Sequence, residues 1–180
     1  MENVFIKKRY HSTFSWADLA NIKEGRGILG EEMPVLVYRL MQYTMLDVLT
    51  KEFGREKANH YIREAGFLAG TEFARNVLDL KADFDKFIAN LQKTLIDLKI
   101  GILRVESVKE GAEEIILTVG EDLDCSGLPI TGESVCDYDE GFIAGILGLY
   151  TGKPYSVREI DCWATGDRVC RFRCTADDKR

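Results

Sequence analysis

The period of the hydrophobic pattern changes once along this chain, near residue 100. Before that point apolar residues recur three and four positions apart, the spacing of a helix with one buried side. After it, short runs rich in β-branched residues are separated by turn-forming residues, which is typical of hairpins. The expected helices lie at about 34–53, 55–78, 83–98 and 134–150. The expected strands lie at about 100–108, 114–119, 155–164 and 168–175.

This order of elements restricts the fold class. Three helices come first, and a hairpin, a helix and a second hairpin follow, so the strand–helix–strand repeat of a parallel sheet is not expected. We therefore predict an α+β fold in which N-terminal helices pack on an antiparallel sheet built from two hairpins. A chain of 180 residues suffices for one core and leaves no room for a second. We expect an N-terminal arm with a short helix over 1–30 and a single domain over 31–180.

Composition and charge exclude several classes of protein. The chain carries 24 Lys and Arg against 30 Asp and Glu, and its basic residues are scattered, which argues against direct nucleic-acid binding. The longest uncharged run, Gly141–Gly152, is shorter than the roughly 20 apolar residues of a membrane span. No apolar segment of the signal-peptide type follows the N-terminus, so we expect a cytoplasmic protein with no membrane partner.

No set of residues in the sequence predicts catalysis. The two histidines, His11 and His60, each lack the orienting third group that a nucleophilic site requires. Two acidic clusters, at 121–124 and 137–140, are interpreted as solvated loops or helix N-termini, and Asp137 and Asp139 lie near an expected helix start. The sequence carries no convincing nicotinamide or flavin motif, so we predict no catalytic residues.

A short internal echo occurs within two of the expected helices. Gly66 and Gly70 lie four residues apart in a similar context to Gly141 and Gly145. Glycine inside a helix costs up to ~1 kcal/mol relative to alanine, so another interaction must offset it. We interpret the glycines as the sign of a close helix crossing. The alternative is that the missing side chains leave room for a ligand.

All five cysteines lie in the last third of the chain. An odd number in an expected reducing compartment argues against a disulfide framework and favours a metal or redox role. Cys162 and Cys170 flank a turn at Gly166, and a hairpin with this turn can bring both thiols to one place. Cys136 lies near the expected start of a helix, where the helix dipole stabilises a thiolate.

Glu159 is a further candidate ligand, three residues before Cys162 on the same expected strand. Strict alternation places these two side chains on opposite faces, so the strand needs a bend or bulge if both bind one ion. With Cys136 and Cys170 they form the closed four-ligand set that suits tetrahedral zinc. The alternative reading is that the cysteines are buried core residues.

The C-terminal sequence resembles the V4R (4-vinyl reductase) domain family. The motif that carries the resemblance runs Cys136-x-Tyr138-x2-Gly141-x3-Gly145 and then Glu159-x2-Cys162-x-Ala164-x-Gly166-Asp167-x2-Cys170-x-Phe172. The helical half is similar as well, so the resemblance extends from about residue 30 to 175. It implies the NO-signalling/Golgi-transport type of fold, similar to Bet3-like TRAPP trafficking subunits and to haem NO-binding domains.

The resemblance also extends to the sensor domains of aromatic-responsive activators, in which a Cys, a Glu and two further Cys bind zinc. It places these ligands on Cys136, Glu159, Cys162 and Cys170. It implies a hydrophobic pocket beside the zinc for a small apolar or aromatic molecule, and a homodimer formed by the N-terminal helices. The candidate pocket residues are Tyr38, Tyr43, Phe67, Phe142 and Tyr150. Such a sensor signals through its dimer or through a protein partner.

Two other functions stay open at this point. A cysteine-based redox sensor would use Cys125, in a loop where we expect the thiol to be exposed, or Cys174 on the last strand. A scaffold subunit of the trafficking type would have an occluded pocket and a stable protein partner.

Overall fold

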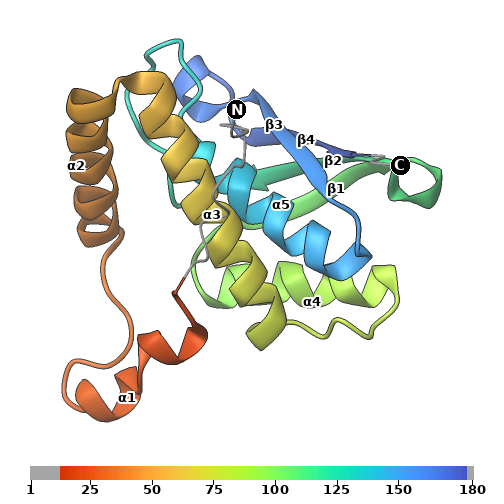
Figure 1. Ribbon diagram of the computed structural model, residues 1–180, viewed down its shortest axis with the longest axis horizontal. Coiled ribbons are helices and arrows are strands. Elements are labelled where there is room, and N and C mark those ends of the chain that lie inside the picture. Colours follow the sequence, from red (N-terminus) through yellow and green to blue (C-terminus); the bar gives the residue numbers. More distant parts are fainter. Residues whose placement is uncertain (1–12, 178–180) are drawn as a thin grey trace, which may run out of the picture. The chain divides into compact units, whose positions relative to one another are not determined.

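The structure is a computed structural model that describes residues 13–177, and they fall into two compact units (Figure 1). The first ends at Glu32 and contains a 3-10 turn, Trp16–Leu19, and the short helix α1, Ile22–Gly25. Asn21 caps α1 by accepting a hydrogen bond from the Glu24 N–H. The second unit begins at Met33 and contains the remaining elements.

The second unit combines helices with one antiparallel sheet, which confirms the predicted α+β class. Its strand order is β1-β2-β4-β3, so β2 of the first hairpin pairs with β4 of the second. The helices are α2 (Val35–Phe53), α3 (Arg55–Val77), α4 (Phe84–Asp97) and α5 (Asp137–Thr151). The strands are β1 (Ile102–Val108), β2 (Glu114–Gly120), β3 (Tyr155–Asp161) and β4 (Cys170–Ala176).

Local residues explain where the helices begin and end. Pro34 precedes α2, where its missing N–H costs nothing, and Gly54 separates α2 from α3 with a positive φ of 81°. Asp83 caps α4 by accepting a hydrogen bond from the Lys86 N–H. Helix α5 begins at Asp137, three residues later than expected, because Cys136 occupies the N-cap position.

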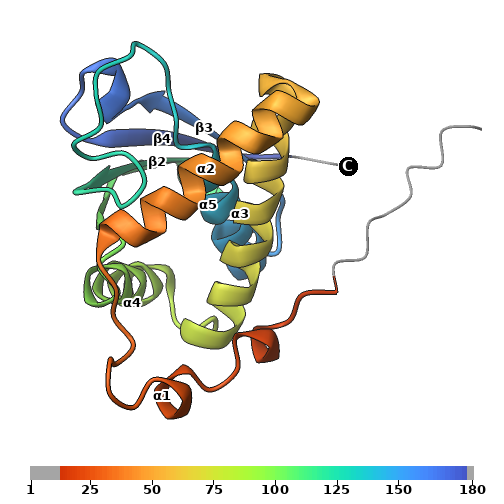
Figure 2. The same ribbon diagram turned by 90° about the vertical axis from the view of Figure 1, so that its left-hand side faces the viewer.

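Helices α3 and α5 cross in close contact, and they lie side by side in Figures 1 and 2. A Cβ at Gly66 or Gly70 would collide with backbone oxygen atoms of α5, and a Cβ at Gly141 or Gly145 would collide with those of α3. The repeated glycines therefore serve close helix packing, which confirms the structural interpretation. The alternative, that they leave room for a ligand, is wrong because backbone of the other helix fills that space.

The core lies between the sheet, α4 and α5, and α3 covers the opposite side of α5 (Figure 1). Its largest fully buried apolar side chains are Phe87, Ile115, Leu117, Leu147 and Phe172. Within residues 13–177, no helix is long and apolar enough to cross a membrane.

The second hairpin differs from its prediction at the turn. Strand β3 ends at Asp161 rather than Ala164, because the chain folds into the 3-10 turn Trp163–Thr165. The backbone N–H groups of Thr165 and Asp167 both donate to the Cys162 carbonyl oxygen, which closes this turn. The turn places Cys162 and Cys170 on facing sides of the same loop.

Candidate metal centre and the neighbouring cavity

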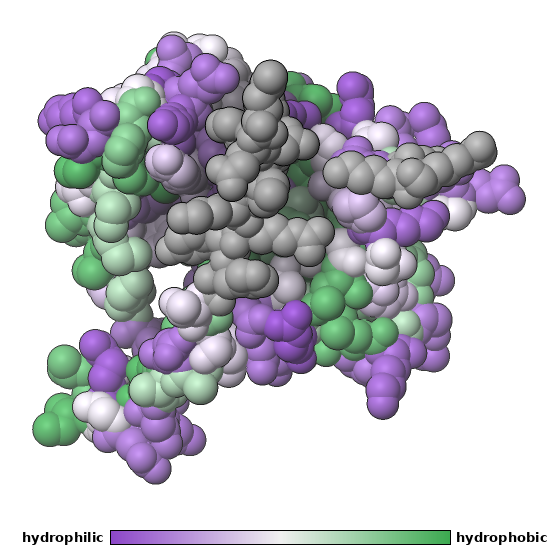
Figure 3. Space-filling view, viewed as in Figure 1, coloured by the Kyte–Doolittle hydropathy of each residue, from purple (hydrophilic) through white to green (hydrophobic). Residues whose placement is uncertain are grey.

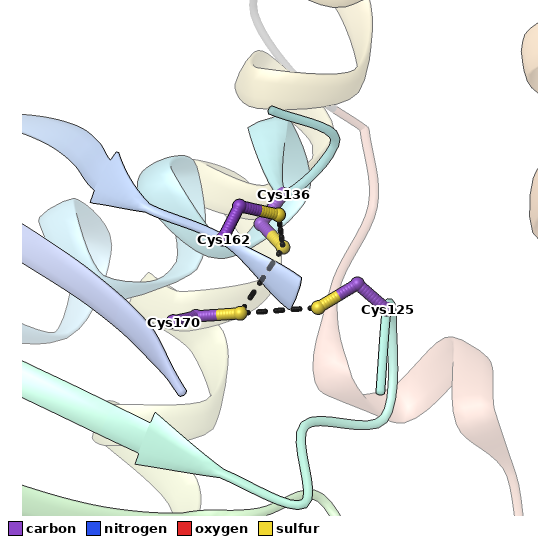
Figure 4. A group of neighbouring side chains, drawn as sticks. All are labelled: Cys125, Cys136, Cys162 and Cys170. Carbon is purple, nitrogen blue, oxygen red and sulfur yellow. Dashed lines mark hydrogen bonds between the residues drawn. The ribbon is translucent and has the colours of Figure 1, made fainter. Parts of the chain in front are cut away.

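Four buried thiols converge at one end of the sheet, as Figure 4 shows. Their Sγ atoms all lie within 4.8 Å of one another; the residues are Cys125, Cys136, Cys162 and Cys170. Cys136 Sγ lies 3.9 Å from Cys162 Sγ and 3.8 Å from Cys170 Sγ, and Cys125 Sγ lies 3.0 Å from Cys170 Sγ. All four side chains are at most 1% exposed. We call this group the thiol cluster, and its four close donors can hold a metal ion.

Each cluster thiol comes from a different local structure. Cys136 caps α5, Cys170 begins β4, and Cys162 lies directly after β3 at the start of the 3-10 turn. Cys125 belongs to the loop after β2, where Asp122 Oδ1 accepts hydrogen bonds from the N–H groups of Asp124 and Cys125. The site therefore joins segments up to 45 residues apart along the chain.

The crowding of the thiols determines their proton affinities. Hydrogen bonding with Cys125, followed by that with the other cluster thiols, raises the pKa of Cys136 and lowers the pKa of Cys162. The pKa of Cys170 is also raised, with Cys125 again the largest cause. The neighbouring S–H groups thus favour the thiolate form at Cys162, and a cation in the cluster would take the place of the shared protons.

Glu159 lies beside the cluster, at the backbone of Cys136. Its Oε2 accepts a hydrogen bond of 3.3 Å from the Cys136 N–H, and its Oε1 is buried without a hydrogen-bond partner. Burial raises the pKa of Glu159 to about 8. The β3–β4 register shifts between Glu159 and Asp161, which is the kind of irregularity that a shared ion would require. The structure thus brings Cys136, Cys162 and Cys170 together with Cys125, and it places Glu159 next to them.

Glu140 is a buried carboxylate that holds the backbone of Glu159. It is only 7% exposed, and its Oε1 accepts a hydrogen bond of 2.8 Å from the Glu159 N–H. Its Oε2 pairs with Arg63 Nε at 2.7 Å and with Arg158 Nη1 at 3.0 Å. The acids at 137–140 lie in the first turn of α5, which confirms the helix N-terminus interpretation. Glu140 is nevertheless buried rather than solvated, and two guanidinium groups compensate its charge.

Two of the three acids before Cys125 are also buried, contrary to the expected solvated loop, whereas Glu121 is exposed. Asp122 is 3% exposed and Asp124 is 2% exposed. Asp124 accepts hydrogen bonds from Tyr38 Oη at 2.7 Å and from Gln42 Nε2 at 2.8 Å. Burial raises the pKa of both carboxyl groups, that of Asp122 to about 7. Polar side chains of α2 take the place of water around this loop.

Helix α2 therefore turns its polar side inward. Arg39 donates to the carbonyl oxygens of Leu123 and Ser126, both at 2.8 Å, and Tyr43 Oη donates to the Asp124 carbonyl at 3.0 Å. No described residue of α2 is buried, and apolar side chains occupy its outer side (Figure 3). The exposed apolar residues of α2 are Val35, Leu36, Val37, Leu40, Met41, Met45, Val48 and Phe53.

A small apolar cavity lies beside the cluster, between α4, α5 and the sheet, and measures about 30 Å³. Asp122 and Asp139 are its acidic lining residues. Its apolar lining consists of Ile88, Leu91, Leu95, Ile100, Leu103, Leu117, Val119, Phe142, Ile143, Ile146 and Leu147.

Of the five predicted pocket residues, Phe142 lines this cavity. Tyr38 and Tyr43 bind the loop around Asp124 instead. Tyr150 stacks on Phe87 with ring centroids 3.7 Å apart, and Phe67 is 47% exposed. The structure does not bring these five side chains together around the cavity.

The two redox candidates are both fully buried. Cys125 has no exposed surface, so the expectation of an exposed thiol in this loop is wrong. Tyr38, Arg39 and Gln42 of α2 cover the loop by their hydrogen bonds. Cys174 is buried on β4 outside the cluster, and burial raises its pKa to about 12.

The part of the chain that carries the thiol cluster is similar in sequence to known proteins. The family model of the V4R domain matches residues 115–176 of this chain. This stretch contains all four cluster cysteines, Glu159 and the whole second hairpin. The resemblance to the V4R domain, inferred from the motif, is therefore confirmed. Two proteins of Methanocaldococcus jannaschii, MJ0150 and MJ1642, are 28% and 27% identical to this chain. The alignments cover 90% and 84% of this chain and 87% and 83% of those proteins.

Solved structures share the fold over most of the chain. The phenol-responsive sensory domain of the transcription activator PoxR, solved with phenol, is 15% identical and superposes with a TM-score of 0.64 over 83% of this chain and 79% of that domain. A vinyl-4-reductase family protein from Methanocaldococcus jannaschii is 16% identical, with a TM-score of 0.58 over 83% and 85%. Trafficking protein particle complex subunit 3 from Naegleria fowleri, covalently bound to palmitic acid, is 12% identical, with a TM-score of 0.59 over 81% and 98%.

Sequence reasoning missed the place of Cys125 in the cluster. The family motif contains Glu159 and not Cys125. Local spacing does not indicate that Cys125 contacts Cys170, which lies 45 residues later in the chain. The signal that was available is the count of cysteines, since all five gather in the region that folds around the second hairpin.

Proposed function

We propose that this chain is a small-molecule-sensing domain built around a structural zinc ion. In this proposal the thiol cluster holds the zinc, and a small apolar or aromatic molecule binds in the adjacent cavity. The observation that carries the proposal is that four buried thiols within 4.8 Å of one another lie beside an apolar cavity in a V4R domain. The signal passes to a second copy of the chain or to a protein partner.

The sulfur geometry supports zinc as the ion. Zinc–sulfur bonds of ~2.3 Å in a tetrahedron place the sulfur atoms about 3.8 Å apart. Cys136 Sγ meets this spacing with both Cys162 and Cys170, at 3.9 and 3.8 Å. Cys125 Sγ lies 3.0 Å from Cys170 Sγ, so these two sulfur atoms would have to move apart for Cys125 to become the fourth ligand. Four thiolates close the coordination sphere, so the ion would tie the Cys125 loop, the start of α5 and the β3–β4 turn together without taking part in a reaction.

The fourth ligand in this proposal is Cys125, and Glu159 is the alternative that the family motif suggests. Glu159 Oε2 already accepts the Cys136 N–H, as outer groups around a metal site often do. X-ray absorption on protein loaded with one equivalent of zinc distinguishes the two sets. Four sulfur neighbours would favour Cys125, whereas three sulfur atoms and one oxygen would favour Glu159.

The cavity supports an apolar ligand and limits its size in this conformation. Its volume of about 30 Å³ compares with roughly 150 Å³ for a protein cavity that binds benzene. An aromatic ligand therefore requires α4 or α5 to move away from the sheet. Such a movement would give ligand binding a structural effect, which a sensor needs. Neighbours solved with phenol and with palmitic acid support an apolar ligand in this fold.

The exposed apolar side of α2 supports a homodimer as the output state. Leu36, Leu40 and Met41 are 74%, 63% and 61% exposed on a helix whose inner side is polar. Packing this side of the helix against a second copy removes apolar surface from water. Each Å² of apolar surface that is buried stabilises the dimer by roughly 25 cal/mol. Because α2 also holds the Cys125 loop, a dimer would be linked to the zinc site.

Metal analysis combined with native mass spectrometry tests this proposal on protein purified without added metal. At least one zinc per chain, lost in Cys162→Ser and kept in Cys174→Ser, would support the thiol cluster as the site. Cys174 is the matched control because it is equally buried and lies outside the cluster. A chain that carries no metal, or a Cys162→Ser variant that binds as many ions as the wild type, would contradict the zinc proposal. An additional small mass would identify the ligand class.

A further inference from the structure

Two carboxylates lie next to the thiol cluster, on the side that faces the cavity. Asp122 from the loop after β2 and Asp139 from the first turn of α5 each place a carboxylate oxygen within 4.8 Å of Cys136 Sγ. The two carboxylate oxygens are also within 4.8 Å of each other. Asp122, Cys136 and Asp139 thus form a second group of close donor atoms that shares one thiol with the cluster.

One oxygen of this group is buried and has no partner. Asp139 Oδ2 is shielded from solvent and accepts no hydrogen bond from the residues that the structure describes. Asp122 Oδ1, in contrast, accepts the N–H groups of Asp124 and Cys125. A buried polar atom without a partner costs about 1–3 kcal/mol, and more when it is charged. The unpaired oxygen of Asp139 therefore indicates a ligand that is not part of the protein chain.

Neither carboxylate has a directly paired cation in the described part of the chain. Within residues 13–177, no Lys or Arg side chain forms an ion pair with Asp122 or Asp139. Arg39 reaches only the backbone carbonyl of Asp122. Two close buried carboxylates without a cation repel each other, whereas a bound cation would remove the repulsion.

We propose that Asp122, Asp139 and Cys136 form a second metal site, for a divalent transition metal ion, with the Cys136 thiolate shared between the two ions. This inference rests on the proposed zinc in the thiol cluster. The mixed donor set favours zinc or iron(II) over magnesium or calcium, because the latter prefer oxygen donors alone. Four thiolates leave the first zinc site with a net charge of about −2, and the carboxylates add two more negative charges that a second dication balances.

The second site differs from the first in its coordination. Three protein donors leave at least one position open, as in zinc sites that bind water or substrate. Both carboxylates line the cavity, so the open position faces it. A small molecule in the cavity can therefore supply the fourth donor atom, which would connect ligand binding directly to the metal centre.

Stepwise metal loading tests the inference by stoichiometry. Metal-free protein is titrated with zinc, then with cobalt(II) in a parallel series, and the number of ions per chain is read by native mass spectrometry. We expect two ions in the wild type and one in Asp139→Asn, which preserves the shape of the side chain. The matched control is Asp85→Asn, an exposed carboxylate in the first turn of α4, which should keep two ions.

The outcomes separate this inference from the proposed function. The ion that Asp139→Asn retains would show that the variant folds and that the first site is intact. One ion per wild-type chain at saturating metal would overturn the second site and leave the zinc proposal standing. Two ions in Asp139→Asn would overturn the assignment of Asp139. A wild type that binds no ion would contradict both proposals. In the cobalt series, loss of the second step of thiolate-to-cobalt absorption in Asp139→Asn would support the shared Cys136 thiolate.

Discussion

Tyr38 on α2 donates a hydrogen bond of 2.7 Å from its hydroxyl group to Asp124 Oδ1. Asp124 directly precedes Cys125 in the chain. Asp124 is buried and Tyr38 is half-buried, and Gln42 donates to the other oxygen of the same carboxylate. Because Asp124 and Cys125 share one tight loop, the position of the Cys125 thiol depends on side chains of α2. This relationship connects the exposed helix with the candidate metal centre.

We predict that Tyr38→Phe weakens metal binding without removing it. The substitution deletes the hydrogen bond to Asp124 and leaves the ring in place, so the Cys125 loop becomes less well held. Loss of an outer hydrogen bond of this kind lowers metal affinity by about tenfold or more. The measurement is zinc affinity in competition with a chromogenic chelator at fixed pH.

Tyr61→Phe on α3 is the control for this experiment. Tyr61 packs edge-on against Phe53, and the substitution keeps that ring contact while removing a hydroxyl far from the loop in sequence. It should leave the zinc affinity unchanged. Equal affinities for wild type and Tyr38→Phe would show that the loop is held without this hydrogen bond.

A second prediction concerns the crossing of α3 and α5. A Cβ at Gly141 would collide with the Arg63 carbonyl oxygen, which is backbone and cannot rotate away. Gly141→Ala should therefore lower the free energy of unfolding by about 1–3 kcal/mol, the usual cost of overpacking. Gly148→Ala on the same helix meets only the Lys153 carbonyl oxygen at 3.5 Å. It should raise the free energy of unfolding by about 0.5–1 kcal/mol, since alanine is the better helix former.

Urea unfolding of the two variants measures both effects, with metal content kept equal. If both variants were destabilised alike, the position of the glycine would not matter and the close crossing would lose its support. The pair thus tests packing separately from helix propensity.

The elements of this fold follow largely from the sequence, because their patterns are local. The predicted helix that begins after Pro34 and ends at Gly54 matches α2, and the two hairpins match the observed strand pairs within a few residues. Alternation on β3 showed that Glu159 and Cys162 can share one ion only if the strand is irregular, and the register does shift next to Glu159. Signals of this kind depend on residues that are neighbours in the chain.

The site was harder to predict, because its contacts join distant segments. The sequence around Asp124 and Glu140 is that of solvated acids. Their partners Tyr38 and Arg63 lie 86 and 77 residues away along the chain, so local patterns do not reveal these contacts. Cys125 looked exposed because its loop contains glycine and proline, yet α2 covers it. Helix periodicity shows which side of α2 is apolar, but it cannot show that the polar side faces the loop.

A third prediction concerns Cys174, one of the two redox candidates. Burial raises its pKa to about 12 from 9.0, so at pH 8 to 9 the group remains a thiol, which does not react with alkylating reagents. Reactivity of the folded protein should rise only when the pH approaches 12 or when the protein unfolds. Iodoacetamide labelling followed by peptide mass spectrometry measures this for each cysteine.

The thiol cluster provides the comparison for Cys174. Removal of metal by a chelator should increase labelling of Cys162 first, because its pKa is lowered by the neighbouring thiols. Cys174 should stay unlabelled in the same sample. Rapid labelling of Cys174 at pH 8 in folded protein would contradict its burial and favour a redox role.

The last prediction concerns the apolar side of α2. Leu36→Glu combined with Leu40→Glu places two charges where a second copy of the chain would pack. The variant should sediment as a single chain of 20.4 kDa, whereas the wild type should sediment at twice that mass. Leu98→Glu, at an equally apolar but separate position that is 53% exposed, should leave the wild-type mass unchanged. The hydrogen bonds of α2 to the Cys125 loop come from its inner side, so the double variant should keep its zinc. A wild type that sediments as a monomer would show that α2 does not mediate self-association, and the apolar side would then have to serve a different partner.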